Sequence, residues 1–216
     1  DLIYRGDRMV NWDPATQTVL SNLEVLTSRE GEKGKFWYLR YPLVDGSGHI
    51  VVGTTRPETM LGDTAVAVHP DDERYQGMIG KKVALPLTDR EIPIIADKIL
   101  PDPTKGTGAV KVTPSHDPND YECGLRQNLP QIQVIGLDGA MIAETCPAEF
   151  AGLDRYEARK LVVQKFEEQG LLEKIEDTIY SPGRSERSGV IVEPLVMKQW
   201  LQTQQEHRIL LLVLMH

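Results

Sequence analysis

The sequence predicts an α+β fold in which a closed or nearly closed β-barrel-like domain is decorated by short helices, with extended connecting strands at both ends. Three observations support this fold class. Short runs rich in β-branched and aromatic residues recur along the chain, turn-forming residues separate them, and only two segments carry strong helix signals. The 216 residues, 40% of them hydrophobic, are enough to bury a substantial core.

The predicted strands alternate with clear turn signals. DGSG and TDRE each separate two runs of β-forming residues. The glycines of KGTG allow a tight turn into the strand AVKVTP. In order along the chain, strands are expected at residues 8–12, 36–44, 49–55, 63–70, 82–87, 91–96, 109–114 and 188–196.

Two segments carry helix signals. Asp117 is suited to be an N-cap residue, Pro118 takes the first helical position and Asp120 follows in the first turn. A longer helix is expected at residues 154–170, where apolar side chains recur near helical spacing and Gly170 provides a stop.

Charge and cysteine content narrow the classes of function. A formal net charge of −8 argues against nonspecific nucleic-acid binding but leaves room for a local basic groove that receives a single strand. Cys123 and Cys146 form no C-x-x-C motif, so neither a disulfide framework nor a thiolate zinc site is expected, and a cytoplasmic location fits best. The sequence does not begin with a signal-peptide core, and the apolar run at residues 209–216 is too short to cross a membrane.

A polar cluster separates two apolar runs in IVVGTTRPETMLGDTAVAVHP. Thr55 and Glu58 have the spacing of a capping box at a helix start, which is a purely structural role. That role leaves Thr54, Arg56 and Thr59 unexplained, and a helix start also aims free backbone N–H groups at whatever lies above it. The cluster therefore predicts either helix-end chemistry or the lining of a pocket.

A second polar cluster lies in KVTPSHDPNDYE. Strand alternation sends Lys111 and Thr113 to one face, after which the chain turns into the helix that begins at Asp117. Asp117 and Asp120 can be a cap and an acid favoured by the helix dipole, or they can line a site. His116 has no second histidine at ligand spacing, which disfavours a metal site, and a consecutive Ser-His-Asp sequence is not a catalytic triad because neighbouring side chains point apart.

Together the two clusters combine cations, hydroxyls and carboxylates. A carboxylate can hold an ammonium group, a cation can neutralise a phosphate or a developing oxyanion, and threonines can recognise a hydroxyl. This set suits a small zwitterionic ligand, and an esterified amino acid has those features.

The motifs TTRPETMLGDTAVAVHP and GTGAVKVTPSHDPNDYE closely resemble the editing domain inserted into valyl-tRNA synthetases, a family of class I aminoacyl-tRNA synthetases. Isoleucyl enzymes usually carry Thr-Thr-Thr-Pro-Trp-Thr in the first motif and leucyl enzymes Thr-Thr-Arg-Pro-Asp-Thr, whereas Glu58 and the following MLGDTAVAV match the valyl pattern. LIYRGDRMVNWDP and GRSERSGVIVEPLVMKQW resemble the segments that join the insertion to the synthetase body.

This resemblance divides the chain into four parts. Residues 1–45 are expected to form connecting strands to the synthetase body, residues 46–178 the editing core, and residues 179–200 a second connecting segment. Residues 201–216 depart from the family pattern and form an atypical tail, for which an artificial origin or a shifted reading frame is one explanation. The HIGH and KMSKS signatures of the aminoacylating site do not occur in the sequence, so the resemblance implies no aminoacylation by this chain.

The resemblance implies hydrolysis of mischarged threonyl-tRNA(Val) to threonine and free tRNA. Threonine and valine are nearly isosteric, and a hydrophobic synthetic pocket cannot strongly reject an added hydroxyl. No metal or other cofactor is expected for editing, and ATP would serve only the synthetic domain that this chain lacks. The expected partners are the 3′ end of tRNA(Val) carrying threonine and the rest of the synthetase chain, with no membrane.

The resemblance also assigns roles to residues. Asp120 is expected to bind the α-ammonium group, and Asp117 to read the side-chain hydroxyl or order water. Thr55 orients the ester, and Lys111 lies near the terminal adenosine or steadies the oxyanion. No single general base is assigned. The expected catalytic residues are Asp120, Lys111, Thr55 and Asp117. The expected substrate-binding residues are Thr54, Arg56, Thr59, Thr113, Glu58 and His116.

Two other functions stay open at this point. A binding-only module could capture the tRNA 3′ end without chemistry, and turnover of the ester separates it from an enzyme. A free-standing deacylase could act on other aminoacyl-tRNAs, but the joining segments at both ends argue against it.

Overall fold

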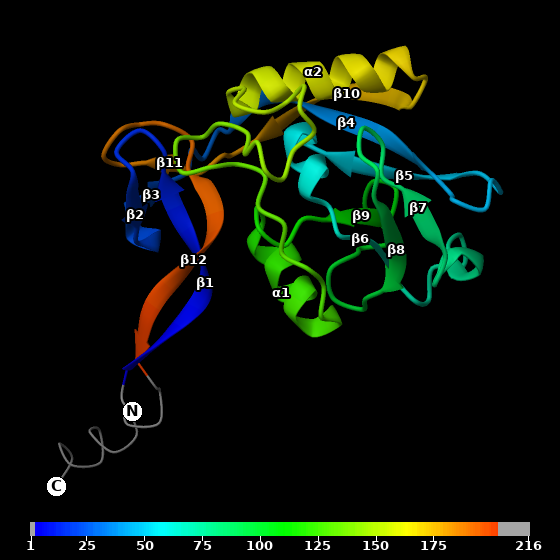
Figure 1. Ribbon diagram of the computed structural model, residues 1–216, viewed down its shortest axis with the longest axis horizontal. Coiled ribbons are helices and arrows are strands. Elements are labelled where there is room, and N and C mark those ends of the chain that lie inside the picture. Colours follow the sequence, from blue (N-terminus) through cyan, green and yellow to red (C-terminus); the bar gives the residue numbers. More distant parts are fainter. Residues whose placement is uncertain (1–2, 203–216) are drawn as a thin grey trace, which may run out of the picture.

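The computed structural model describes residues 3–202, which form an α+β fold made mostly of strands (Figure 1). The strands are β1 (Ile3–Asp13), β2 (Thr18–Leu20), β3 (Val25–Leu26), β4 (Glu32–Pro42), β5 (His49–Thr54), β6 (Ala65–Val68), β7 (Lys82–Ala84), β8 (Glu91–Ala96), β9 (Ala109–Val112), β10 (Leu172–Tyr180), β11 (Arg184–Ser185) and β12 (Glu193–Gln202). The helices are α1 (Pro118–Gln127) and α2 (Arg155–Glu168), with the 3₁₀ helices η1 (Asn22–Glu24), η2 (Pro57–Gly62) and η3 (Gln76–Met78).

A long antiparallel ribbon of β1 and β12 carries both ends of the described chain (Figure 1). Its register runs from Ile3 opposite Gln202 to Trp12 opposite Glu193, and β2 pairs with the other edge of β1. The ribbon thus brings the predicted first and second connecting segments side by side. Most of the predicted atypical tail, residues 203–216, lies outside the described residues.

Two sheets form the body that holds the polar clusters. One has the order β10-β4-β5 and is antiparallel, and the other has the order β7-β8-β6-β9, in which β6 and β8 run parallel. The sheets approach each other where β5 lies beside β9 and where a single bridge joins Leu43 to Val83. The α+β class is confirmed. A closed barrel is not found, because the four sheets of residues 3–202 are all open.

Strand β4 connects two parts of the chain that the sequence separates. It lies within the predicted connecting segment at residues 1–45, yet it pairs with β5 and β10 of the predicted editing core. The first connecting segment and the editing core therefore share a sheet, and the division at residue 45 stays a prediction.

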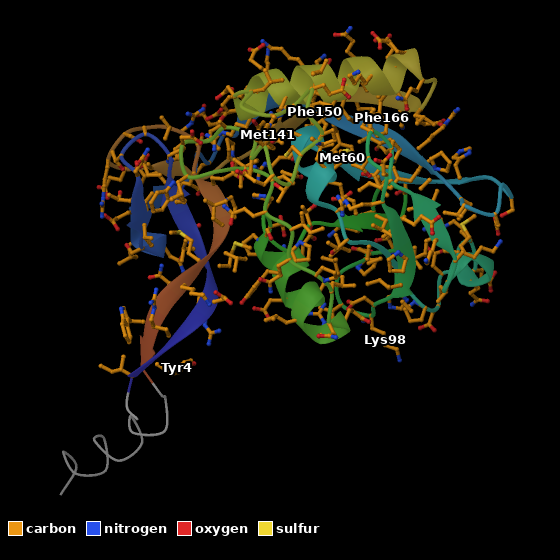
Figure 2. The ribbon with its side chains drawn as sticks, viewed as in Figure 1. Tyr4, Met60, Lys98, Met141, Phe150 and Phe166 are labelled. Atoms are coloured by element: carbon orange, nitrogen blue, oxygen red, sulfur yellow. The ribbon has the colours of Figure 1, made fainter. Side chains whose placement is uncertain are left out.

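The largest hydrophobic cluster lies against α2. Figure 2 shows Met60, Met141, Phe150 and Phe166 gathered beneath this helix, and all four side chains are buried. The ring of Phe166 lies 6.4 Å from that of Tyr41 on β4, centroid to centroid. Because burying a large apolar side chain is worth about 1.5–3 kcal/mol, this cluster holds η2 and the loop before α2 in fixed positions.

The predicted start of α1 is confirmed. The Asp117 carboxylate accepts hydrogen bonds from the backbone N–H groups of Asn119 (2.8 Å) and Asp120 (3.1 Å), as an N-cap does. In α2, Asp154 caps in the same way by accepting the N–H of Tyr156 at 2.8 Å. No helix within residues 3–202 is both long and apolar enough to span a membrane.

The predicted capping box of Thr55 and Glu58 is wrong. Residues 57–62 form the 3₁₀ helix η2, whose N-cap is Arg56, and no side chain caps it. Glu58 is fully buried and accepts hydrogen bonds from Arg159 instead, at 2.7 and 2.8 Å. A buried carboxylate needs charged partners, and a bidentate guanidinium satisfies it better than one backbone N–H group does.

Candidate functional site

The two polar clusters meet in one pocket of about 220 Å³. The end of β5, the helix η2, strand β9 and the start of α1 converge there. Nine of the ten predicted site residues line the pocket, together with Phe36, Gly53 and Val110: Thr54, Thr55, Arg56, Thr59, Lys111, Thr113, His116, Asp117 and Asp120. Glu58 is the exception and lines an adjacent cavity. The structure thus brings the predicted residues together, and their individual roles stay predictions.

The Lys111 ammonium group occupies the floor of the pocket. It is buried and donates hydrogen bonds to Thr59 Oγ1 at 2.9 Å, to Asp63 Oδ1 at 3.0 Å and to Thr113 Oγ1. An ammonium group has three protons, so these three acceptors use all of them. Lys111, on β9, is therefore held in one orientation by Thr59 of η2, by Asp63 directly after η2 and by Thr113 directly after β9.

Asp63 is a member of this network that sequence reasoning missed. Its carboxylate is fully buried and accepts hydrogen bonds from Thr113 Oγ1 at 2.6 Å and from the Tyr41 hydroxyl at 2.8 Å, besides that from Lys111. Burial raises the pKa of Asp63, and the positive charge of Lys111 opposes that rise. The only sequence signal was an acidic residue between two apolar runs, in MLGDTAVAV.

Asp120 lies at the pocket wall with a carboxylate that titrates near neutral pH. Its Oδ2 accepts the backbone N–H of Thr113 at 2.8 Å, and only 6% of the residue is exposed. Burial is the main cause that raises the pKa of Asp120 to about 7, the nearby Asp117 carboxylate adds to it, and Lys111 opposes it. A cation that entered the pocket would stabilise the ionised form, so the site is suited to an ammonium ligand.

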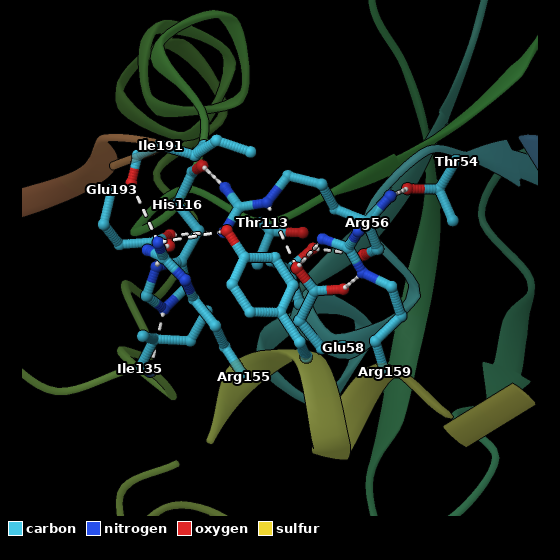
Figure 3. A network of polar contacts seen from close by, with 12 residues as sticks. Thr54, Arg56, Glu58, Thr113, His116, Ile135, Arg155, Arg159, Ile191 and Glu193 are labelled. Atoms are coloured by element: carbon cyan, nitrogen blue, oxygen red, sulfur yellow. Dashed lines mark hydrogen bonds and ion pairs between the residues drawn. The ribbon is translucent and has the colours of Figure 1, made fainter. Parts of the chain in front are cut away.

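Arg56 forms the wall between this pocket and a second cavity of about 190 Å³. Thr55, Arg56, His116 and Asp117 line both spaces. The Arg56 guanidinium donates to the backbone oxygen of His116 at 3.1 Å and to Glu58 Oε1 at 3.3 Å, and it also contacts Glu193 (Figure 3). These contacts fix the guanidinium from three sides.

Glu193 links the pocket wall to the ribbon. It is the first residue of β12, it is buried, and it accepts a hydrogen bond from Arg155 at 2.7 Å in addition to that from Arg56 (Figure 3). Burial alone would raise the pKa of Glu193, but the positive charges of Arg56 and Arg155 oppose this rise, and the pKa of Glu193 is about 2. Sequence reasoning missed Glu193 and its partner on α2, Arg155, and it also missed Arg159 on α2, which pairs with Glu58. No local pattern in the sequence connects these residues to Arg56.

The His116 ring is held in place by hydrogen bonds to the backbone behind the pocket. The ring is buried, and Nε2 accepts the backbone N–H groups of Val134 at 2.9 Å and Ile135 at 3.3 Å. Its Nδ1 lies 3.6 Å from Glu193 Oε1, beyond hydrogen-bond distance. Burial lowers the pKa of His116, so the ring is neutral and supports the loop behind the pocket.

Residues 3–202 contain no group of three or more His, Cys, Asp or Glu side chains placed to hold a metal ion. The expectation that editing needs no metal is not tested by this observation and stays a prediction.

The sequence is similar to an editing-domain family and to valine–tRNA ligases. The family described as "Leucyl-tRNA synthetase, editing domain" matches residues 70–167. Over 199 residues, or 92% of this chain, the sequence is 58% identical to a valine–tRNA ligase of Geobacillus kaustophilus and 57% identical to that of Geobacillus stearothermophilus. It is 54% identical to the valine–tRNA ligase of Coxiella burnetii over the same share of the chain.

The chain spans about a fifth of the length of these relatives, at 22%, 22% and 21% respectively. Together the matches fit an editing domain of a valyl-tRNA synthetase, and the resemblance seen in the two motifs is confirmed.

Proposed function

We propose that this chain hydrolyses the ester of mischarged threonyl-tRNA(Val), releasing threonine and tRNA. One observation carries the proposal: a single pocket combines the buried Asp120 carboxylate, four threonine side chains and a fixed ammonium group. An aminoacyl ester has an ammonium group, a side chain and a carbonyl that match these three features. The similarity to valine–tRNA ligases supports the choice of tRNA.

In the proposed reaction, Asp120 binds the α-ammonium group of the aminoacyl ester and so fixes the carbonyl carbon in the pocket. A water molecule adds its oxygen to that carbon, the bond to the ribose oxygen breaks, and the ribose oxygen takes up a proton. Lys111 already donates its three protons inside the pocket floor, so its contribution to the developing oxyanion is its charge and not a new hydrogen bond. Positioning and electrostatics supply the catalysis.

Discrimination follows from the polar lining. A threonyl side chain can form a hydrogen bond with a pocket oxygen, whereas a valyl side chain of nearly the same size would leave that oxygen desolvated and unpaired. An unpaired buried polar group costs about 1–3 kcal/mol. The site therefore prefers the residue that the synthetic pocket fails to reject. No cofactor takes part, ATP serves only the synthetic domain, and the partners are the 3′ end of the tRNA and the rest of the synthetase chain.

The test compares deacylation of threonyl-tRNA(Val) and valyl-tRNA(Val) by the wild type, by Asp120→Ala and by a control, Asp71→Ala. Asp71 is an exposed acid in the turn after β6 that does not line the pocket, so the control removes the same charge outside the site. We expect loss of threonine, sparing of valine, no turnover by Asp120→Ala and full turnover by Asp71→Ala. Equal cleavage of both esters, or full activity of Asp120→Ala, contradicts the proposal.

A result in which the wild type cleaves neither ester is informative when binding is measured as well. Tight binding of a nonhydrolysable threonyl-adenosine analogue without turnover would indicate a module that only captures the tRNA 3′ end.

A further inference from the structure

The hydrogen-bond directions in the pocket floor are fixed by chemistry. A hydroxyl group has one proton to donate and two lone pairs that accept. Thr113 Oγ1 accepts a proton from Lys111, which can only donate, so its own proton points to the Asp63 carboxylate 2.6 Å away. Thr59 Oγ1 likewise accepts from Lys111, and its proton points to the backbone oxygen of Arg56 at 3.0 Å.

Toward a ligand in the pocket, both threonine hydroxyls can therefore act only as hydrogen-bond acceptors. Their protons are already bound to protein acceptors, and each hydroxyl has one lone pair left for a ligand. Both residues line the pocket. The pocket floor can thus accept a hydrogen bond from a ligand but has no hydroxyl proton to give to it from Thr59 or Thr113.

Asp63 is the acceptor that sets the direction of the Thr113 hydroxyl, and it also holds the Lys111 ammonium group that donates to both threonines. One of its oxygens receives both the Lys111 ammonium and the Thr113 hydroxyl, and the other is held by Tyr41 from the core. Asp63 itself is fully buried and does not line the pocket, so it acts through its neighbours.

We propose that Asp63 is a positioning residue that sets the pocket floor as a hydrogen-bond acceptor, so that the site selects an aminoacyl side chain that donates a proton. This inference rests on the proposed function and adds to it the polarity of the recognised group. The threonine hydroxyl is bound as a donor. A side chain of the same size that can accept a hydrogen bond but cannot donate one should bind as weakly as valine does.

The first test uses the wild-type chain and three adenosine analogues with a nonhydrolysable amide link, bearing threonine, valine or 2-amino-3-fluorobutyrate. Fluorine is close to a hydroxyl in size but has no proton to donate. We expect the threonyl analogue to bind at least about tenfold more tightly than the fluorinated one, in keeping with the loss of about one buried hydrogen bond. We also expect the fluorinated and valyl analogues to bind alike. Binding of the fluorinated analogue within about twofold of the threonyl one overturns the proposal.

The second test compares Asp63→Ala with Asp63→Asn. The asparagine side chain keeps a carbonyl oxygen that can accept from Lys111 and Thr113, whereas alanine removes the acceptor. We expect the preference for the threonyl analogue to stay in Asp63→Asn and to fall to about threefold or less in Asp63→Ala. If Asp63 had a merely structural role, Asp63→Ala would weaken the binding of both analogues equally and leave the ratio of their affinities unchanged. That result would contradict the proposal. If Asp63→Ala does not fold, the wild-type comparison and Asp63→Asn still decide the matter.

Failure of the inference differs from failure of the proposed function. Hydrolysis of threonyl-tRNA(Val) together with equal binding of the threonyl and fluorinated analogues would keep the function and refute the polarity. If the chain prefers the threonyl analogue but does not hydrolyse threonyl-tRNA(Val), the proposed function is refuted and the acceptor character of the pocket floor is kept.

Discussion

Asp120 is expected to destabilise the fold at neutral and alkaline pH. Only 6% of this residue is exposed, and burial raises the pKa of its carboxyl from 3.8 to about 7. Each unit of pKa shift corresponds to about 1.4 kcal/mol, so the shift is equivalent to ~4 kcal/mol as an upper value. The substitution Asp120→Asn keeps the size and an oxygen for the Thr113 N–H group but cannot ionise.

The sign of the pH dependence follows from proton binding. Between pH 3.8 and about 7 the folded chain binds this proton more tightly than the unfolded chain does, so the free energy of unfolding falls as pH rises. The contribution of Asp120 to stability is complete below the unfolded pKa and is lost as pH rises through the folded pKa. Asp120→Asn should therefore be more stable than the wild type by up to ~4 kcal/mol at pH 8, with a gap that closes toward pH 4.

The assay is urea denaturation of both proteins at pH 8, 6 and 4, at constant ionic strength, with the free energy of unfolding obtained by linear extrapolation. Subtracting one protein from the other cancels the titration of every other group. A gap that is independent of pH, or a wild type more stable than Asp120→Asn at pH 8, would refute the assignment of a raised pKa to this residue. The same variant should not deacylate threonyl-tRNA(Val), because it lacks the charge proposed to bind the ammonium group.

Substitutions at three other positions test the elements around the pocket. Asp117→Ala should lower the free energy of unfolding by about 1 kcal/mol through loss of the α1 cap, whereas Asp117→Ser should restore most of it in urea denaturation; equal losses would contradict the capping role. Glu193→Ala leaves the buried Arg155 guanidinium and the partly exposed Arg56 guanidinium without their shared carboxylate and should cost about 3–5 kcal/mol at pH 7, so a loss below about 1 kcal/mol would show that the network contributes little. Thr55→Ala should slow deacylation but change the free energy of unfolding by less than about 0.5 kcal/mol, because η2 has no side-chain cap. A loss of about 1 kcal/mol would instead indicate that Thr55 does cap η2.

Much of the fold follows from local patterns in the sequence. The β-forming runs and the glycine-containing turns predicted strands that correspond to β5, β6, β8 and β9, and the Asp-Pro pair predicted the start of α1. The candidate site was also predictable as two motifs. Lys111 and Thr113 share a face, as strand alternation requires, and both contact Asp63.

The error in the capping-box prediction arises because the Glu58 side chain has a choice of partners. The spacing of Thr55 and Glu58 is correct for a capping box, but Glu58 is buried beside Arg159, and the ion pair replaces the cap. The barrel-like arrangement that the many short strands suggested stays a prediction, because the sheets of residues 3–202 are open and two of them are joined by a bridge between Leu43 and Val83.

The sequence by itself determined several of the strands, the start of α1, the membership of the two polar motifs and the similarity to valyl-type editing domains. Only the tertiary structure decided that Glu193 pairs with Arg56 across 137 residues, that Asp63 orients Lys111, and that Asp120 titrates near neutral pH. The physical reason is that backbone conformation depends on neighbouring residues, whereas exclusion of water and the pairing of buried charges depend on which distant segments pack together.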